Sequence, residues 1–270
     1  MRRIVLLVVL IGSVVVVIPQ GRAAVTGEHR FSIVCPFSHL QQVDPIVTPG
    51  PSGTPAAHLH AFFGNRSTDA DSTYRSMLSA GTTCELSKDR AGYWVPTLVR
   101  PDGEVVKPTS AFAYYRANPA TQDEVITPFP RDFRAVSDRY VYHCGSMRRE
   151  STGPVDCRGL PHSQVVLSIL FSPCWDGVQL DAPDHRSHIV WPKGGACPSS
   201  HPVEVPVVGL HVRYPLARIT SEWQLTSGPL ESAHGDFFNS WRQRALRRLV
   251  SKCLGVTKSA GDGLCERVQD

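Results

Sequence analysis

Tyr93-Trp94-Val95-Pro96-Thr97-Leu98-Val99 is an aromatic and β-branched run that predicts a β-strand. The turn residues Pro101-Asp102-Gly103 and then Glu104-Val105-Val106 follow, so the stretch as a whole predicts a β-hairpin. Similar short runs, bounded by Pro, Gly, Asn, Asp or Ser, recur along the chain. They cover residues 31–35, 112–115, 139–142, 164–171, 187–191 and 209–214. This spacing predicts a mainly β fold, either sandwich-like or built on a strongly curved sheet.

One helix is expected near the C-terminus. Phe238, Trp241, Ala245 and Leu249 recur at helical spacing, and Asp236 is placed to cap the helix N-terminus. The predicted fold is therefore mainly β with a C-terminal α-helix.

The first 23 residues have the pattern of a secretory signal. A basic start is followed by an aliphatic run over residues 4–18 and then by small residues at 21 and 23. A retained anchor is the alternative, but the run is shorter than the roughly 20 residues that span a bilayer. We expect cleavage, an exported protein without stable membrane insertion, and a single domain over residues 24–270.

The charge of the chain gives no reason to expect nucleic acid as a partner. The formal net charge is +4, and Arg2, Arg3 and Arg22 of the leader supply most of it. The remaining chain is nearly neutral, without the basic excess that nucleic-acid binding requires. We also expect a monomer.

Eight cysteines follow the leader, an even number that in an exported protein predicts disulfides. Sequence alone does not fix their connectivity. Local spacing suggests the pairs Cys35–Cys84, Cys144–Cys157, Cys174–Cys197 and Cys253–Cys265. Zinc binding by thiolates is the alternative, but the chain has no Cys-x-x-Cys pair.

His58 and His60 are two residues apart, so on a strand they project to the same side. They could bind a metal or shape a polar cleft, or form an ordinary pair of backbone-bonded histidines. Phe63 and Asn65, which follow closely, are candidate substrate-binding residues.

The densest group of polar residues runs from residue 174 to residue 201. Its members are Asp176, Asp181, Asp184, His185, His188 and His201. Carboxylates near imidazoles can serve as general acid and base, and the same residue types bind divalent metals. The alternative is a turn-rich loop in which these groups have structural partners.

Three further residues complete the candidate site. Trp175 could stack on a sugar ring or lie in the core beside a disulfide. His234 and Asp236 are expected at a helix N-terminus, where backbone amides favour anions.

The chain resembles the family of unknown function DUF1996 in the residues of several short motifs and in their order along the chain. They are Asp44-Pro45-Ile46-Val47-Thr48-Pro49-Gly50, His58-Leu59-His60-Ala61-Phe62-Phe63-Gly64-Asn65, Tyr93-Trp94-Val95-Pro96-Thr97-Leu98, Cys174-Trp175-Asp176-Gly177, Asp184-His185-Arg186-Ser187-His188, Cys197-Pro198-Ser199-Ser200-His201-Pro202 and His234-Gly235-Asp236-Phe237. The resemblance implies a secreted protein of fungi or actinobacteria. Because some relatives carry carbohydrate-binding WSC modules, it also implies a cell-wall or polysaccharide context.

We therefore predict a His/Asp-rich cleft that acts on cell-wall or extracellular polysaccharide by hydrolysis or elimination. Its catalytic candidates are Asp176, Asp184, His185, His188 and His58, and its substrate-binding candidates are His60, Phe63, Asn65, Trp175, His201, His234 and Asp236. One set is expected to converge in a single cleft, which could hold a divalent metal: His58, His60, Asp176, Asp184, His185, His188 and His201. The alternatives are a non-catalytic glycan-binding module, with Trp175, Phe62, Phe63 and Trp241 as platforms, and a secreted metal-binding protein.

Overall fold

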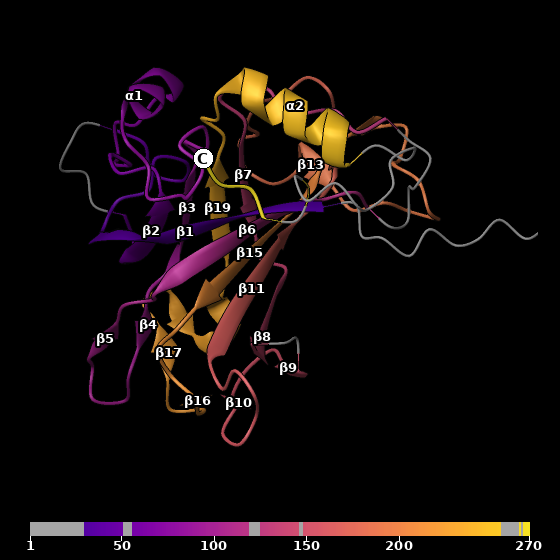
Figure 1. Cartoon of the computed structure of the whole chain (residues 1–270). Coiled ribbons are helices and arrows are strands. Elements are labelled where there is room, and N and C mark those ends of the chain that lie inside the picture. The colour runs from indigo at the N-terminus through magenta and orange to yellow at the C-terminus, as the bar shows by residue number, and fades with distance from the viewer. Residues whose placement is uncertain (1–29, 51–55, 119–124, 146–147, 255–264, 266) are drawn as a thin grey trace, which may run out of the picture.

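A ten-stranded antiparallel sheet curls into a half-barrel (Figure 1). The computed structural model describes residues 30–50, 56–118, 125–145, 148–254, 265 and 267–270. In spatial order the strands are β7 (Arg134–Ser137), β19 (Gly235–Phe238), β3 (Gly92–Pro96), β2 (His60–Gly64), β1 (Arg30–Gln41), β6 (Ser110–Arg116), β15 (Val207–Arg213), β11 (Val165–Phe171), β8 (Tyr140–Cys144) and β9 (Arg148–Ser151). The fold is mainly β, as predicted, and of the two expected forms it is the curved sheet.

Within the described part of the chain, three small sheets and three helical segments surround the half-barrel. The sheets are β10 (Val155–Asp156) with β16 (Arg218–Ile219); β12 (Cys174–Trp175) between β13 (Ile189–Val190) and β14 (Val203–Glu204); and β18 (Gly228–Pro229), β17 (Gln224–Leu225), β4 (Leu98–Val99) and β5 (Val105–Val106). The helical segments are α1 (Tyr74–Ser79), the 3₁₀ turn η1 (Leu230–Ser232) and α2 (Gln243–Cys253). The predicted hairpin is confirmed as β4 and β5, whereas the run over residues 187–191 forms only the two-residue strand β13.

The curl of the sheet begins in β1, which pairs with two different neighbours. Its first half, up to Pro36, pairs with β6, and its second half, from Phe37, pairs with β2. An irregularity between Phe37 and His39 shifts the register there, and such bulges bend a strand and increase its twist. The two halves of the sheet therefore face one another.

The two halves of the curled sheet meet through close contacts between a side chain of one half and the backbone of the other. Ser137, at the end of β7, donates from Oγ to the Leu170 carbonyl of β11 over 2.6 Å. Gly235 on β19 lies so close to β11 that an added Cβ would stand 3.0 Å from Ile169. A larger residue at 235 would push the two strands apart.

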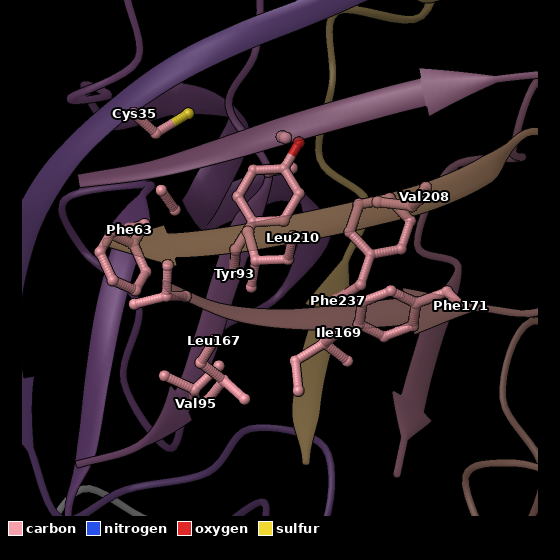
Figure 2. Close-up of a cluster of buried hydrophobic side chains, with 14 of the residues drawn as sticks. Cys35, Phe63, Tyr93, Val95, Leu167, Ile169, Phe171, Val208, Leu210 and Phe237 are labelled. Atoms are coloured by element: carbon pink, nitrogen blue, oxygen red, sulfur yellow. The ribbon is translucent and has the colours of Figure 1, made fainter. Parts of the chain in front are cut away.

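The main core fills the interior of the curl (Figure 2). Strand alternation explains its composition, because every second residue of a strand points to the same face. On β11 the inward residues are Leu167, Ile169 and Phe171, and they meet Tyr93 of β3 and Phe237 of β19. Full burial of each such side chain stabilises the fold by roughly 1.5–3 kcal/mol.

Four disulfides brace the structure: Cys35–Cys84, Cys144–Cys157, Cys174–Cys197 and Cys253–Cys265. These are the pairings that local spacing suggested. None of the cysteines in the described structure is free.

The C-terminal helix exists, but the prediction of its start was wrong. The helix α2 begins at Gln243 and has Arg242 as its N-cap residue, whereas Asp236 and Phe238 belong to strand β19. Leu246 and Val250 of α2 are buried against one end of the curled sheet (Figure 1). No helix among the described residues is long and apolar enough to cross a membrane. The predicted leader, residues 1–23, lies outside the described residues.

A chain of buried hydrogen bonds connects the core to Asp89. Its carboxylate accepts from the Ala91 amide and the Tyr93 hydroxyl, each over 3.0 Å. The Tyr93 hydroxyl lies 2.6 Å from that of Tyr115, which accepts from the Trp241 indole. Burial raises the pKa of Asp89 to about 7, and its hydrogen bonds offset only part of this effect.

We predict that Asp89→Asn removes a pH dependence of stability. In wild-type protein the folded carboxyl keeps its proton up to about pH 7, whereas in the unfolded chain it ionises near 3.8. The folded state then binds more protons between these values, so wild-type stability falls relative to Asp89→Asn as pH rises, by up to about 1.4 kcal/mol per pH unit. Urea unfolding of both proteins from pH 4 to 8 measures this. A stability difference that does not change with pH would contradict it.

Candidate metal centre

Two strands of the curled sheet, β2 and β19, and the segments before them bring three histidines to the outer face of the sheet. His60 begins β2, and His58 lies two residues earlier. His234 immediately precedes β19, which is separated from β2 by β3 alone. In this register Phe62 and Asp236 both pair with Trp94, so His60 and Asp236 lie on one face, opposite the main core. A second apolar cluster, including Phe62, Trp94 and Phe238, covers that face.

The three imidazoles are in direct contact. The His58 and His60 ring centroids are 4.4 Å apart, which agrees with the expectation that the two side chains share a side. The Nε2 atoms of His58 and His234 lie 3.2 Å apart. One ring nitrogen from each histidine lies within 4.8 Å of the others, close enough for a single metal ion to bind all three.

Backbone carbonyls orient two of these rings. Nδ1 of His60 lies 3.0 Å from the Val43 carbonyl, and Nδ1 of His234 lies 2.9 Å from the Ser232 carbonyl. Because a carbonyl can only accept, each Nδ1 carries the proton and each Nε2 keeps its lone pair. A hydrogen bond from the ring nitrogen that does not bind the metal is the usual support of a metal-binding histidine.

Two buried carboxyl groups adjoin the histidines. Oδ2 of Asp44 lies 3.9 Å from Nε2 of His60, while its Oδ1 accepts from the amides of Ile46 and Val47. Asp236 is fully buried, and neither of its carboxyl oxygens has a hydrogen-bond partner in the described structure. One carboxyl oxygen of Asp44, one of Asp236 and one ring nitrogen of His60 all lie within 4.8 Å of one another. We call these five residues, His58, His60, His234, Asp44 and Asp236, the histidine–aspartate centre.

Burial controls the protonation of the centre. Burial first, and then the neighbouring histidines, lower the pKa of His58 to about 4 and that of His60 to about 3. Burial also lowers the pKa of His234. It raises the pKa of Asp44, against hydrogen bonds that lower it, and raises that of Asp236 far above its usual range. The imidazoles are therefore neutral at neutral pH, which is the form that binds metals.

The aspartates of residues 174–201 have their own structural partners. Asp184 accepts from the backbone amide of Arg186 and from the amide and hydroxyl of Ser187. These bonds lower the pKa of Asp184 to about 2. Burial would raise the pKa of Asp176, but bonds from Val178 and Gln179 outweigh burial and lower it. Both side chains stabilise turns and are ionised, so neither has the raised pKa of a general acid.

The histidines of this segment also bond locally. His185 pairs with Asp181 over 2.8 Å, and His201 Nε2 lies 2.8 Å from the Ser187 carbonyl. His188 is buried, with Nε2 2.7 Å from the Arg134 carbonyl of β7 and its ring against Phe133. No hydrogen bond or ring contact within the described structure joins them to the histidine–aspartate centre. The structure therefore brings His58 and His60 together and adds His234 and Asp236 to them, whereas the side chains of residues 174–201 have partners of their own.

The predicted aromatic platforms are mostly interior residues. Phe62, Phe63 and Trp241 are fully buried and cannot stack on a sugar. Asn65 is buried and donates to the Met77 and Arg90 carbonyls. Trp175 is half-buried, and its indole donates to the Gln179 carbonyl over 2.6 Å.

A cleft of about 270 Å³ lies beside β7, the neighbour of β19. Arg139 lies 4.2 Å from the ring centre of Trp191 in its wall. Arg186 and Asp138, also in the wall, form a 2.6 Å ion pair and are close enough to His234 to affect its pKa. The cleft and the histidine–aspartate centre are therefore neighbours.

Sequence reasoning missed Asp44 as a site residue. It opens one of the motifs that carry the family resemblance, which was the available signal. Its turn-forming bonds to Ile46 and Val47 are an ordinary role for Asp, so nothing in the local pattern pointed to a ligand.

Fold and site together define a curled β half-barrel with a buried centre of histidines and aspartates. The chain belongs to the DUF1996 family, described as a domain of unknown function, whose profile matches residues 44–241. The match includes all five residues of the histidine–aspartate centre. No curated protein and no solved structure matches the chain significantly.

We predict that Asp236→Asn stabilises the metal-free protein at neutral pH by about 1 kcal/mol or more. Folding buries this carboxyl without a partner, whereas the amide has no charge to lose. Urea unfolding in the presence of a chelator measures the difference. Asp102→Asn, at an exposed turn, is the control and should change stability by less than about 0.5 kcal/mol. An unchanged or less stable Asp236→Asn protein would contradict the prediction.

Proposed function

We propose that the protein binds one divalent transition-metal ion at the histidine–aspartate centre. The convergence of three imidazoles, two with Nδ1 fixed by a backbone carbonyl, carries this proposal. Imidazole ligands suit zinc, copper, iron and nickel, whereas calcium and magnesium prefer all-oxygen sites. Zinc is the first candidate, because three protein ligands with room for a fourth is the pattern of catalytic zinc.

The ligands differ in exposure, and this supports a reactive site rather than a purely structural one. His60 is fully buried, whereas His58 and His234 are only partly so. Water or a substrate can therefore approach from the side of His58 and His234. A bound zinc ion would make water a nucleophile near neutral pH. A bound cation would favour the ionised form of the adjacent carboxyl groups, so Asp44 and Asp236 are the groups placed to accept the proton.

The finer proposal is metal-assisted cleavage of an extracellular polysaccharide. Four disulfides support an extracellular location, since such bonds persist in oxidising compartments. The cleft beside β7 offers Trp191 and the polar pair Arg186–Asp138 to a sugar next to the centre. In this arrangement the residues of the cleft hold the substrate and the aspartates of the centre move the proton.

We predict that chelator-treated protein takes up one zinc ion per chain. His60→Ala and His234→Ala should each weaken zinc binding by more than about 100-fold, because each removes a ligand. The loss of a hydrogen bond that merely supports a ligand already lowers metal affinity by about 10–100-fold. Calorimetric titration and elemental analysis measure this. The matched control is His162→Asn, at an exposed position whose φ of 56° Asn tolerates. Equal zinc affinity in all four proteins would refute the site.

Polysaccharide cleavage is tested with zinc-loaded wild type and a panel of purified cell-wall polysaccharides. We expect new reducing ends from hydrolysis, or unsaturated products from elimination, and loss of either with chelator or in Asp236→Asn. If the protein binds zinc but forms no product from any polysaccharide, the metal site stands and the proposed cleavage is excluded. Product formation that survives both the chelator and Asp236→Asn would place the chemistry elsewhere.

A further inference from the structure

A second groove, of about 250 Å³, lies on the outer face of the other half of the sheet. It crosses β6, β15, β11 and β8, on the side opposite the main core. Alternation places Phe112, Tyr114 and Arg116 of β6 there, next to His211 and Arg213 of β15. We call it the arginine groove.

Arginine and aromatic side chains stack along this groove. The Arg213 guanidinium lies 3.9 Å from the Phe112 ring centre. The Phe112 and Tyr114 rings are nearly parallel, with centroids 5.9 Å apart and planes 19° apart. A guanidinium that stacks by its flat face keeps its in-plane N–H groups for an anion. The stack therefore pre-orients Arg213 at little entropic cost.

The described residues that line the groove carry positive charge and include no carboxylate. Within the described structure neither Arg116 nor Arg213 forms an ion pair. The pKa of the neighbouring His211 reflects this, because burial and then His143, Arg116 and Arg213 lower it to about 3. An anion is the ligand that complements this surface.

A buried polar chain fixes one acceptor at the groove. Nδ1 of His143 lies 3.0 Å from the Cys144 carbonyl and must donate, so Nε2 accepts from the Ser168 hydroxyl over 2.7 Å. The hydroxyl oxygen then accepts from Nδ1 of His211 over 2.9 Å, which leaves Nε2 of His211 as an acceptor. A side chain at Gly209 would crowd this atom, because an added Cβ would lie 3.2 Å away.

We propose that the arginine groove binds an acidic saccharide. The carboxylate of one uronate residue pairs with Arg213 and that of another with Arg116, because the register places these arginines near opposite ends of the groove. A ring hydroxyl donates to Nε2 of His211, and Tyr114 contacts the sugar ring. Combined anionic and aromatic recognition fits a charged sugar better than an inorganic ion. The groove holds about one ring, so neighbouring residues of the saccharide extend beyond it. This binding does not depend on the metal centre.

The test is calorimetric titration of the whole protein with trigalacturonate. Maltotriose, a neutral saccharide, and citrate, an anion without a ring, are the comparison ligands. We expect trigalacturonate to bind and maltotriose not to bind. Arg116→Gln and Arg213→Gln should each weaken trigalacturonate binding at least about fivefold. Tyr114→Leu should weaken the binding of trigalacturonate more than the binding of citrate. Arg148→Gln, exposed on β9, is the matched control and should bind as wild type does.

Several results would overturn the proposal. Equal affinity for citrate and trigalacturonate would mean a simple anion site, and binding unaffected by either Arg substitution would place the ligand elsewhere. Thermal melts confirm that each variant is folded. Chelator-treated and zinc-loaded proteins should bind trigalacturonate equally, so failure here is distinguishable from failure of the metal centre.

Discussion

The insertion of β19 between β3 and β7 is the constraint on which both core and site depend. Alternation along this four-residue strand sends Phe237 inward, against Tyr93, Phe129 and Phe171, and sends Asp236 outward. The inward side chain joins the two halves of the curl. The outward Asp236, with His234 just before the strand, completes a site whose other members lie roughly 175 to 190 residues earlier. A slip of one residue would exchange the two faces and destroy both.

The histidine–aspartate centre is costly to the metal-free fold. Three neutral imidazoles crowd together, and the Asp236 carboxyl is buried without a partner, an arrangement that costs several kcal/mol in an apolar setting. The dense core and four disulfides offset this cost. A bound cation would satisfy the same groups. Such local conflict within an otherwise consistent fold is typical of functional sites, where stability is exchanged for function.

Local patterns in the sequence predicted what local physics determines. The hairpin of β4 and β5, the strand β11 within residues 164–171 and the shared side of His58 and His60 all depend on neighbours in the chain. Asp236 was misassigned because an Asp before a helical run is a good N-cap, and nothing local shows that β3 and β7 flank it. Asp176 and Asp184 suggested catalysis by their density, yet the same residue type in turn-rich segments bonds to nearby amides. Long-range pairing, which joined residue 234 to residue 58, has no signature in a single sequence.

X-ray absorption spectroscopy of the zinc-loaded protein tests the central claim most directly. The account predicts a four- to five-coordinate ion with three imidazole ligands near 2.0 Å and light-atom oxygen neighbours. In His60→Ala protein the imidazole contribution should fall by one ligand or the zinc should be lost. An ion coordinated mainly by oxygen, or three imidazoles that persist in His60→Ala, would contradict the assignment of the histidine–aspartate centre as the metal site.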